Sequence, residues 1–80
     1  MNPDKYPEEK KFEVRTYGFT ELAQLYNPTL QPGSAANALR RWIQYNPKLV
    51  AALEDAGWLK GQRKLTPLQT LQITLFLGDP

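Results

Sequence analysis

The sequence predicts a mainly α fold: a compact domain of four short helices with a small two-stranded antiparallel sheet. Four segments carry helix start and stop signals around apolar residues at helical spacing. Two other segments, 12–17 and 63–65, fit short strands, and either strand alone would leave its backbone groups unpaired. Because 80 residues can bury only one small core, we expect a single domain of modest stability.

The chain opens with a polar, proline-punctuated stretch that has no hydrophobic period. We therefore expect residues 1–11 to form a disordered arm and residues 12–80 to form the domain. Residues 12–17 alternate apolar and polar side chains, which predicts a strand with Phe12 and Val14 directed inward. Thr20 is the expected N-cap of the first helix, which would run from Glu21 to Tyr26.

The central helix is predicted over residues 34–45, with Ser34 as its N-cap and Pro47 enforcing a stop. Ala35, Leu39 and Trp42 fall on one side of this helix. The opposite side carries no acid, and its side chains are of the types that hydrogen-bond base edges in the major groove: Asn37, Arg40, Arg41 and Gln44. This face is the main reason to favour nucleic-acid binding. The alternative is an ordinary polar face that lacks acids by chance.

The third helix should begin at Asn46-Pro47 and end at Gly57, with Trp58 packing back on Leu53. A basic turn and a second strand follow, so that residues 58–65 would form a wing.

Thr66, Pro67 and Gln69 give a capping box for a last helix that runs to Leu77. This helix is apolar on two sides, which suggests a homodimer through Ile73 and Leu77. The alternative is that the strand pair covers the second side.

Composition narrows the classes of function. The chain has no cysteine and no histidine, and its acids do not cluster, so we expect no metal, no cofactor and no enzymatic activity. Residues 15–65 hold seven basic and three acidic side chains, which suits a surface that faces phosphates. No apolar run approaches the roughly 20 residues of a membrane span, and the N-terminus does not read as a secretory signal. The expectation is a cytoplasmic protein without membrane contact.

Two resemblances add to this interpretation. The segment Phe19 to Tyr26 ("FTELAQLY"), followed by "LRRWI" at Leu39 to Ile43, resembles the helix-turn-helix of MerR-like and excisionase-like DNA-binding proteins. The resemblance implies that residues 34–45 enter the major groove, supported by the first helix. The connection over residues 27–33 is longer than the usual turn of about three or four residues.

Nearly the whole chain is also similar to a family of short bacterial proteins of unassigned function. The features that carry this similarity are "RTYG" from Arg15, "ELAQLY" from Glu21, "RRWI" from Arg40, "NP" from Asn46 and "TP.Q" from Thr66. The resemblance supports one compact domain and implies no activity.

The favoured hypothesis is a small, winged-helix-like DNA-binding protein, such as a transcriptional regulator or a mobile-element accessory factor. The central helix would read the groove, and flanking cations would hold phosphates. The candidate DNA-binding residues are Ser34, Asn37, Arg40, Arg41, Gln44, Lys48, Lys60, Arg63 and Lys64. The alternative is a protein-interaction or homodimerisation module without nucleic acid, favoured by the two-sided last helix and by Tyr17 and Tyr45, which we expect to be exposed.

Overall fold

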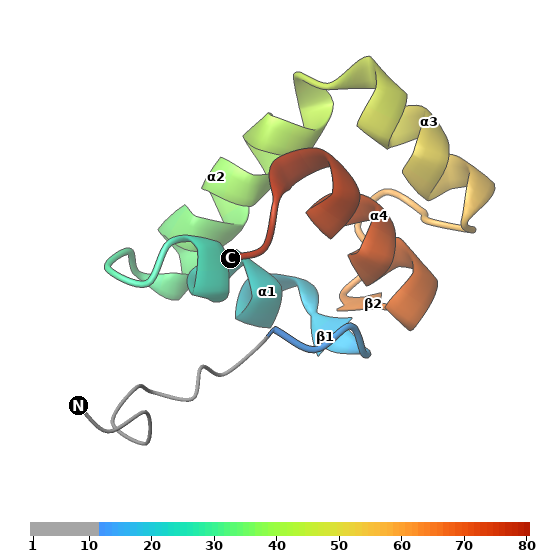
Figure 1. Cartoon of the computed structure of the whole chain (residues 1–80). Helices are drawn as coiled ribbons and strands as arrows, with labels where there is room; N and C mark the ends of the chain where they lie inside the picture. Colours follow the sequence, from blue (N-terminus) through green and yellow to red (C-terminus); the bar gives the residue numbers. More distant parts are fainter. Residues whose placement is uncertain (1–11) are drawn as a thin grey trace.

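A computed structural model of the chain describes residues 12–80, so the expected arm over residues 1–11 lies outside the described residues. Figure 1 shows the elements in order: β1 (Tyr17–Gly18), α1 (Phe19–Tyr26), α2 (Pro32–Gln44), α3 (Pro47–Asp55), β2 (Lys64–Leu65) and α4 (Pro67–Leu77). The two strands pair antiparallel, with Tyr17 opposite Leu65 and Gly18 opposite Lys64. The predicted mainly α class with a small antiparallel sheet is therefore confirmed.

The core lies where the four helices meet the strand pair. Its fully buried large apolar side chains come from every helix and from β2: Leu22, Leu39, Ile43, Leu49, Leu53, Leu65 and Ile73. Ala35 and Ala36, at the start of α2, are also buried, and their small side chains allow α1 to pack closely against α2. Among the described residues, no helix is long and apolar enough to cross a membrane.

The first predicted strand is too long. Only Tyr17 and Gly18 join the sheet, while Val14 and Thr16 are exposed. The physical reason is that β2 has only two residues before Thr66 caps α4, so residues 12–16 have no partner strand. Tyr17 is buried rather than exposed, and its hydroxyl donates to the Glu13 carbonyl at 2.9 Å.

The starts of the first two helices also differ from the prediction. Gly18, not Thr20, is the N-cap of α1, and Glu21 reaches back so that its Oε1 accepts from the Gly18 N–H at 3.1 Å. Helix α2 begins at Pro32, which places Ser34 inside the first turn rather than at the cap. Proline is favoured at the first helical position because its fixed φ suits the helix and its missing N–H has no partner there anyway.

The remaining helix ends follow the predicted chemistry. Asn46 caps α3 by accepting from the Leu49 N–H at 3.2 Å. Gly57 has φ +86°, and the Trp58 N–H donates to the Leu53 carbonyl at 2.9 Å, which is the Schellman ending expected from the sequence. Thr66 caps α4, where the Gln69 N–H donates to the Thr66 hydroxyl at 3.2 Å.

Gln69 does more than complete this capping box. Its side chain is buried, with Oε1 accepting from the Thr66 N–H at 3.0 Å and from Gln62 Nε2 at 2.6 Å. Its own Nε2 donates to the Ala56 carbonyl at 3.1 Å. We call these contacts the Gln69 network. The network ties the start of α4 to the end of α3 and to the segment between them.

The orientation of α4 corrects one sequence prediction. The helix buries Gln69, Thr70 and Thr74 beside Ile73, and Leu77 packs half-buried against the core. The dimer surface expected at Ile73 and Leu77 is therefore unavailable. The Gln69 amide forms its hydrogen bonds inside the domain, and Ile73, one turn later on the same side of α4, is buried as well. Leu68, Leu71 and Leu75 therefore face outward.

Replacing Gln69 tests the network. We expect Gln69→Ala to lower the free energy of unfolding by about 2–4 kcal/mol, because a cavity forms and buried polar groups lose their partners. Gln31→Ala is the matched control, since this exposed glutamine makes no side-chain capping bond, and it should change stability by less than about 0.5 kcal/mol. Urea unfolding followed by tryptophan fluorescence measures both, and equal effects would contradict the assigned role.

Candidate nucleic-acid interface

The predicted polar face of α2 is open to solvent. Ser34, Asn37, Arg40, Arg41 and Gln44 are all exposed. The contacts that position Arg40 involve no acidic side chain. Its Nη1 donates to Asn37 Oδ1 at 2.9 Å, and its guanidinium lies 5.2 Å from the centroid of the Phe19 ring. Packing on an aromatic ring keeps an arginine in place while leaving its charge available to a ligand.

The segment after α3 brings further cations to this region. It turns at Gly61, whose φ is +84°, and the Gln62 N–H donates to the Leu59 carbonyl at 3.0 Å. The Arg63 carbonyl accepts from the Phe19 N–H at 2.7 Å, which fastens the turn to the start of α1. Since Gln62 also bonds to Gln69, the turn is anchored at both ends and presents Lys60 and Arg63 to solvent.

Two open depressions meet at Arg40. One, of about 360 Å³, is lined by Phe19, Gly61 and Arg63 among others, and the second, of about 260 Å³, is lined by Gln44, Trp58 and Lys60. Arg40 lines both, with Arg63 in the first depression and Lys60 in the second. We call Arg40, Gln44, Lys60 and Arg63 the cationic cleft. Each depression also contains one exposed acid, Glu21 in the first and Glu54 in the second.

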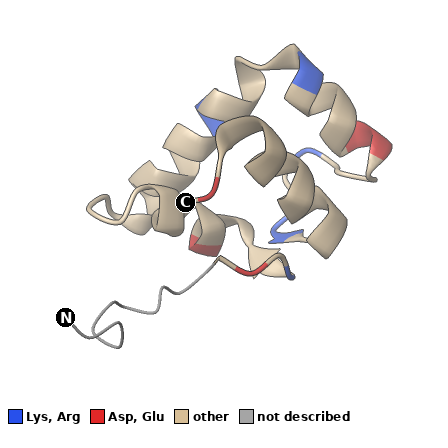
Figure 2. Ribbon diagram, viewed as in Figure 1, with Lys and Arg blue, Asp and Glu red and all other residues tan. Residues whose placement is uncertain are grey.

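The basic side chains of the cleft are not neutralised by the described residues. Within residues 12–80 the only ion pair joins Arg15 Nη2 to Glu21 Oε2 at 3.2 Å, and of these two residues only Glu21 lines a depression of the cleft. Figure 2 shows acidic residues at the end of α3, near the start of α1 and beside the C-terminus, with basic residues on α2, α3 and the turn. The cleft can therefore offer its guanidinium and ammonium groups to an anion.

Several predicted site residues do not join the cleft. Ser34, Asn37, Arg41, Lys48 and Lys64 are exposed but line neither depression. Arg41 follows Arg40 by about 100° around the helix, so it lies at the opposite edge of the same polar face of α2.

Three residues that shape the cleft were missed. Phe19 lies beneath Arg40, Gly61 turns the chain, and Trp58 was assigned only to the core. A glycine in the basic turn between Lys60 and Arg63 was the available sequence signal.

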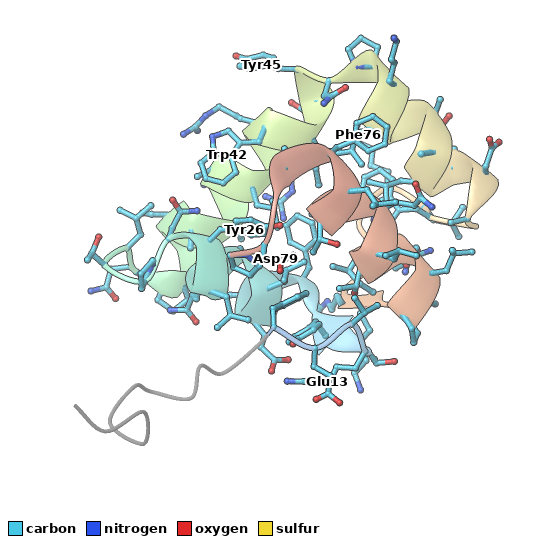
Figure 3. The ribbon with its side chains drawn as sticks, viewed as in Figure 1. Glu13, Tyr26, Trp42, Tyr45, Phe76 and Asp79 are labelled. Atoms are coloured by element: carbon cyan, nitrogen blue, oxygen red, sulfur yellow. The ribbon has the colours of Figure 1, made fainter. Side chains whose placement is uncertain are left out.

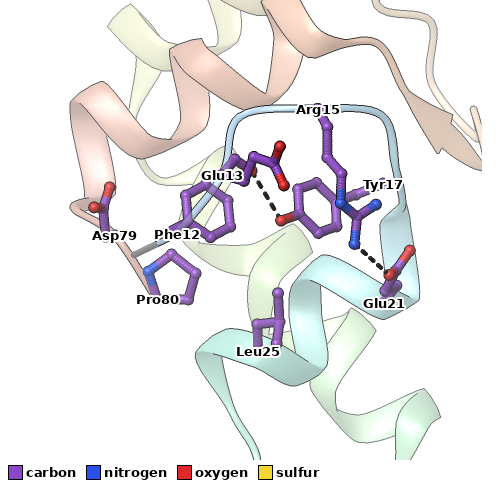
Figure 4. A pocket seen from close by; sticks show the side chains of 8 residues that line it. All are labelled: Phe12, Glu13, Arg15, Tyr17, Glu21, Leu25, Asp79 and Pro80. Carbon is purple, nitrogen blue, oxygen red and sulfur yellow. Dashed lines mark hydrogen bonds and ion pairs between the residues drawn. The ribbon is translucent and has the colours of Figure 1, made fainter. Parts of the chain in front are cut away.

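A larger depression lies elsewhere. Figure 4 shows this hollow of about 770 Å³, which is lined by Phe12, Glu13, Arg15, Tyr17, Glu21, Leu25, Asp79 and Pro80. It holds three acids and one base, and that base is already paired with Glu21. The balance of charge disfavours a phosphate there. Within the described range, no group of three or more histidine, cysteine or acidic residues could hold a metal ion.

Tyr26 and Trp42 connect α1 and α2 to the chain end. Their rings meet edge to face with centroids 6.0 Å apart, and the Tyr26 hydroxyl donates to the Gly78 carbonyl. Burial, with a smaller contribution from Asp79, raises the pKa of Tyr26 to about 12. Trp42, assigned to the core from its position on α2, is 39% exposed. The pair stabilises the helix contact and lies outside the cleft.

The chain belongs to a family whose model, described as a domain of unknown function (DUF4248), matches residues 13–80. This match agrees with the similarity to a family of unassigned function that the sequence motifs indicated. Comparison with curated proteins and with solved structures gives no match. The family therefore supplies no activity, and function has to be argued from the side chains described above.

The Glu21 carboxylate gives a pH test of the start of α1. The hydrogen bond from the Gly18 N–H, followed by that from Arg15, holds the pKa of Glu21 below its usual value. A lowered pKa in the folded state stabilises the protein above the unfolded-state pKa, and this contribution is lost as the pH falls through the lowered value. Glu21→Gln should therefore be less stable than the wild type near neutral pH and equally stable in strong acid.

Urea midpoints measured across the acid range check this prediction. Asp55→Asn serves as control, because the Asp55 side chain makes no hydrogen bond or ion pair with the described residues. The difference in urea midpoint between Asp55→Asn and the wild type should vary less with pH than the difference between Glu21→Gln and the wild type. A Glu21→Gln difference that stays constant from neutral pH into strong acid would count against the assigned contacts.

Proposed function

We propose that this domain binds DNA through the cationic cleft and the exposed face of α2. One observation carries the proposal. Arg40 lines both depressions of the cleft, which also hold Arg63 and Lys60, and none of the three has an ion-pair partner among residues 12–80. Uncompensated cations on a surface attract a polyanion, because each phosphate that they neutralise releases condensed counterions.

The arrangement fits the two kinds of contact that DNA-binding proteins make. Arg40, Arg41 and Asn37 lie on one exposed helix and are suited to base edges in the major groove. Lys60 and Arg63, on the anchored turn, are suited to the phosphates beside the groove. On this proposal α1 and α2 act as the helix-turn-helix and residues 58–65 as the wing, with Ser34, Lys48 and Lys64 as outlying phosphate contacts.

The modest charge of the cleft limits the number of phosphates it can hold. Three cations share the two depressions with two acids, Glu21 and Glu54, so we expect few phosphate contacts and affinity that falls with salt. Sequence-specific binding would then depend on the side chains of α2. A regulatory role, or an accessory role on a mobile element, would follow from such specificity, and each remains part of the proposal.

A protein-interaction module is the second candidate, and it has an observation of its own. Helix α4 exposes Leu68, Leu71, Leu75 and Phe76, although Gln69, Thr70 and Thr74 are buried. Exposed apolar patches on soluble proteins often mark interaction sites. These four side chains line neither depression of the cationic cleft, so a partner on α4 and DNA at the cleft are compatible.

Charge-removing variants test DNA binding. We expect affinity for mixed-sequence duplex DNA to fall steeply between about 50 mM and 200 mM salt. Arg63→Ala and Lys60→Ala should each reduce the log–log salt slope by about 0.9, the value of one phosphate contact. The double variant Arg40→Ala/Arg41→Ala should abolish binding at low salt. Fluorescence anisotropy measures all of these affinities.

Arg15→Ala is the matched control, because it removes the same charge from a side chain that lines neither depression of the cleft. Its salt slope should equal that of the wild type. Two results would refute the proposal: no binding at low salt, or an equal loss from Arg15→Ala and Arg63→Ala.

A further inference from the structure

The outer surface of α4 is unusual for a helix in a small domain. Leu68 is 52% exposed, Leu71 36%, Leu75 66% and Phe76 40%, while Gln69 is 1% exposed and Thr70 is fully buried. The first three occupy positions i, i+3 and i+7, which share one side of a helix and form a seam of the kind that pairs with another helix. Figure 3 shows Phe76 projecting from the C-terminal half of α4.

We propose that this seam pairs with the same seam of a second copy of the chain. The first argument is charge. Residues 65–78 contain no charged side chain, so the seam offers nothing complementary to a charged partner. A two-fold axis brings each surface against itself, and any charge on it would meet its like. An uncharged apolar row meets no such repulsion.

The second argument is self-complementary spacing. Residues 68 and 75 are placed almost symmetrically about the midpoint of α4, which spans Pro67–Leu77. When two copies cross antiparallel, Leu68 therefore lies opposite Leu75 of the partner subunit, and the reciprocal pair forms at the other end. Leu71 lies beside the axis. The row matches its own copy without an insertion or a shift.

The length of α4 determines what kind of dimer to expect. Eleven residues make a helix of about 16 Å, and one face of that length buries less than the roughly 800 Å² per partner of a standard stable complex. The dimer is accordingly reversible and depends on concentration.

The chain's own N-terminal segment is a poor occupant of the row. Six of residues 1–11 are charged, and burying those charges against leucines would be costly.

Pairing through α4 leaves the cationic cleft open. The segment that carries Lys60 passes behind α4 in Figure 1, and neither the three seam residues nor Phe76 line the cleft. The dimer needs no nucleic acid and goes beyond the proposed function. Its test is accordingly run without DNA, so that failure of one proposal leaves the other standing.

Sedimentation equilibrium of the full chain tests the pairing. The apparent mass of the wild type should rise with concentration from 9.2 kDa towards twice that value. Leu68→Lys and Leu75→Glu should each remain monomeric, because each places a charge against a leucine. An equimolar mixture of the two variants should dimerise again, since the lysine then faces the glutamate across an antiparallel pair.

Leu30→Glu is the control, because Leu30 is 39% exposed but lies in the connection between α1 and α2. It should dimerise like the wild type, and circular dichroism should show every variant folded. The proposal is overturned if the wild type stays monomeric at all concentrations or if Leu75→Glu dimerises normally. Failure of the mixture to recover would overturn the antiparallel pairing.

Discussion

The buried side-chain amide of Gln69 is the constraint on which the arrangement depends. A polar group in a core is costly unless its hydrogen bonds are satisfied, and this amide is satisfied by contacts from three different segments. Thr66 begins α4, Ala56 ends α3, and Gln62 lies in the turn between them. Because the bonds form only when all three are in place, the network selects one arrangement of the C-terminal half of the domain.

Both candidate surfaces follow from this constraint. Turning Gln69 inward rotates α4 so that Ile73 completes the core while Leu68 and Leu75 face outward. Holding Gln62 fixes the turn that carries Lys60 and Arg63, and the bond from the Phe19 N–H to the Arg63 carbonyl brings that turn beside Arg40. The role of the network is to position the cationic cleft, whose first depression Gln62 itself lines, and to expose the seam.

Features that depend on neighbouring residues could be predicted from the sequence, whereas contacts between residues far apart in the chain could not. The caps at Asn46 and Thr66 and the Gly57 ending depend on neighbouring residues, so short motifs predict them. The first strand was predicted to be too long, because its length is limited by β2, which lies about fifty residues away in the sequence. Gln69 was recognised as a capping residue, but its contacts with Gln62 and Ala56 are tertiary. For the same reason, the exposure of Arg40 was predictable, whereas its place in the two depressions that also hold Lys60 and Arg63 was not.

The most direct test of the central claim is a titration of the ¹⁵N-labelled chain with a short DNA duplex, followed by the chemical shifts of its amides. The account requires that the turn held by Gln69 and the neighbouring face of α2 contact DNA together. It predicts the largest shifts at Arg40, Gln44, Gly61 and Arg63, reversed by added salt. The absence of any shift at low salt, or the largest shifts at residues lining the acidic hollow of Figure 4, would contradict it.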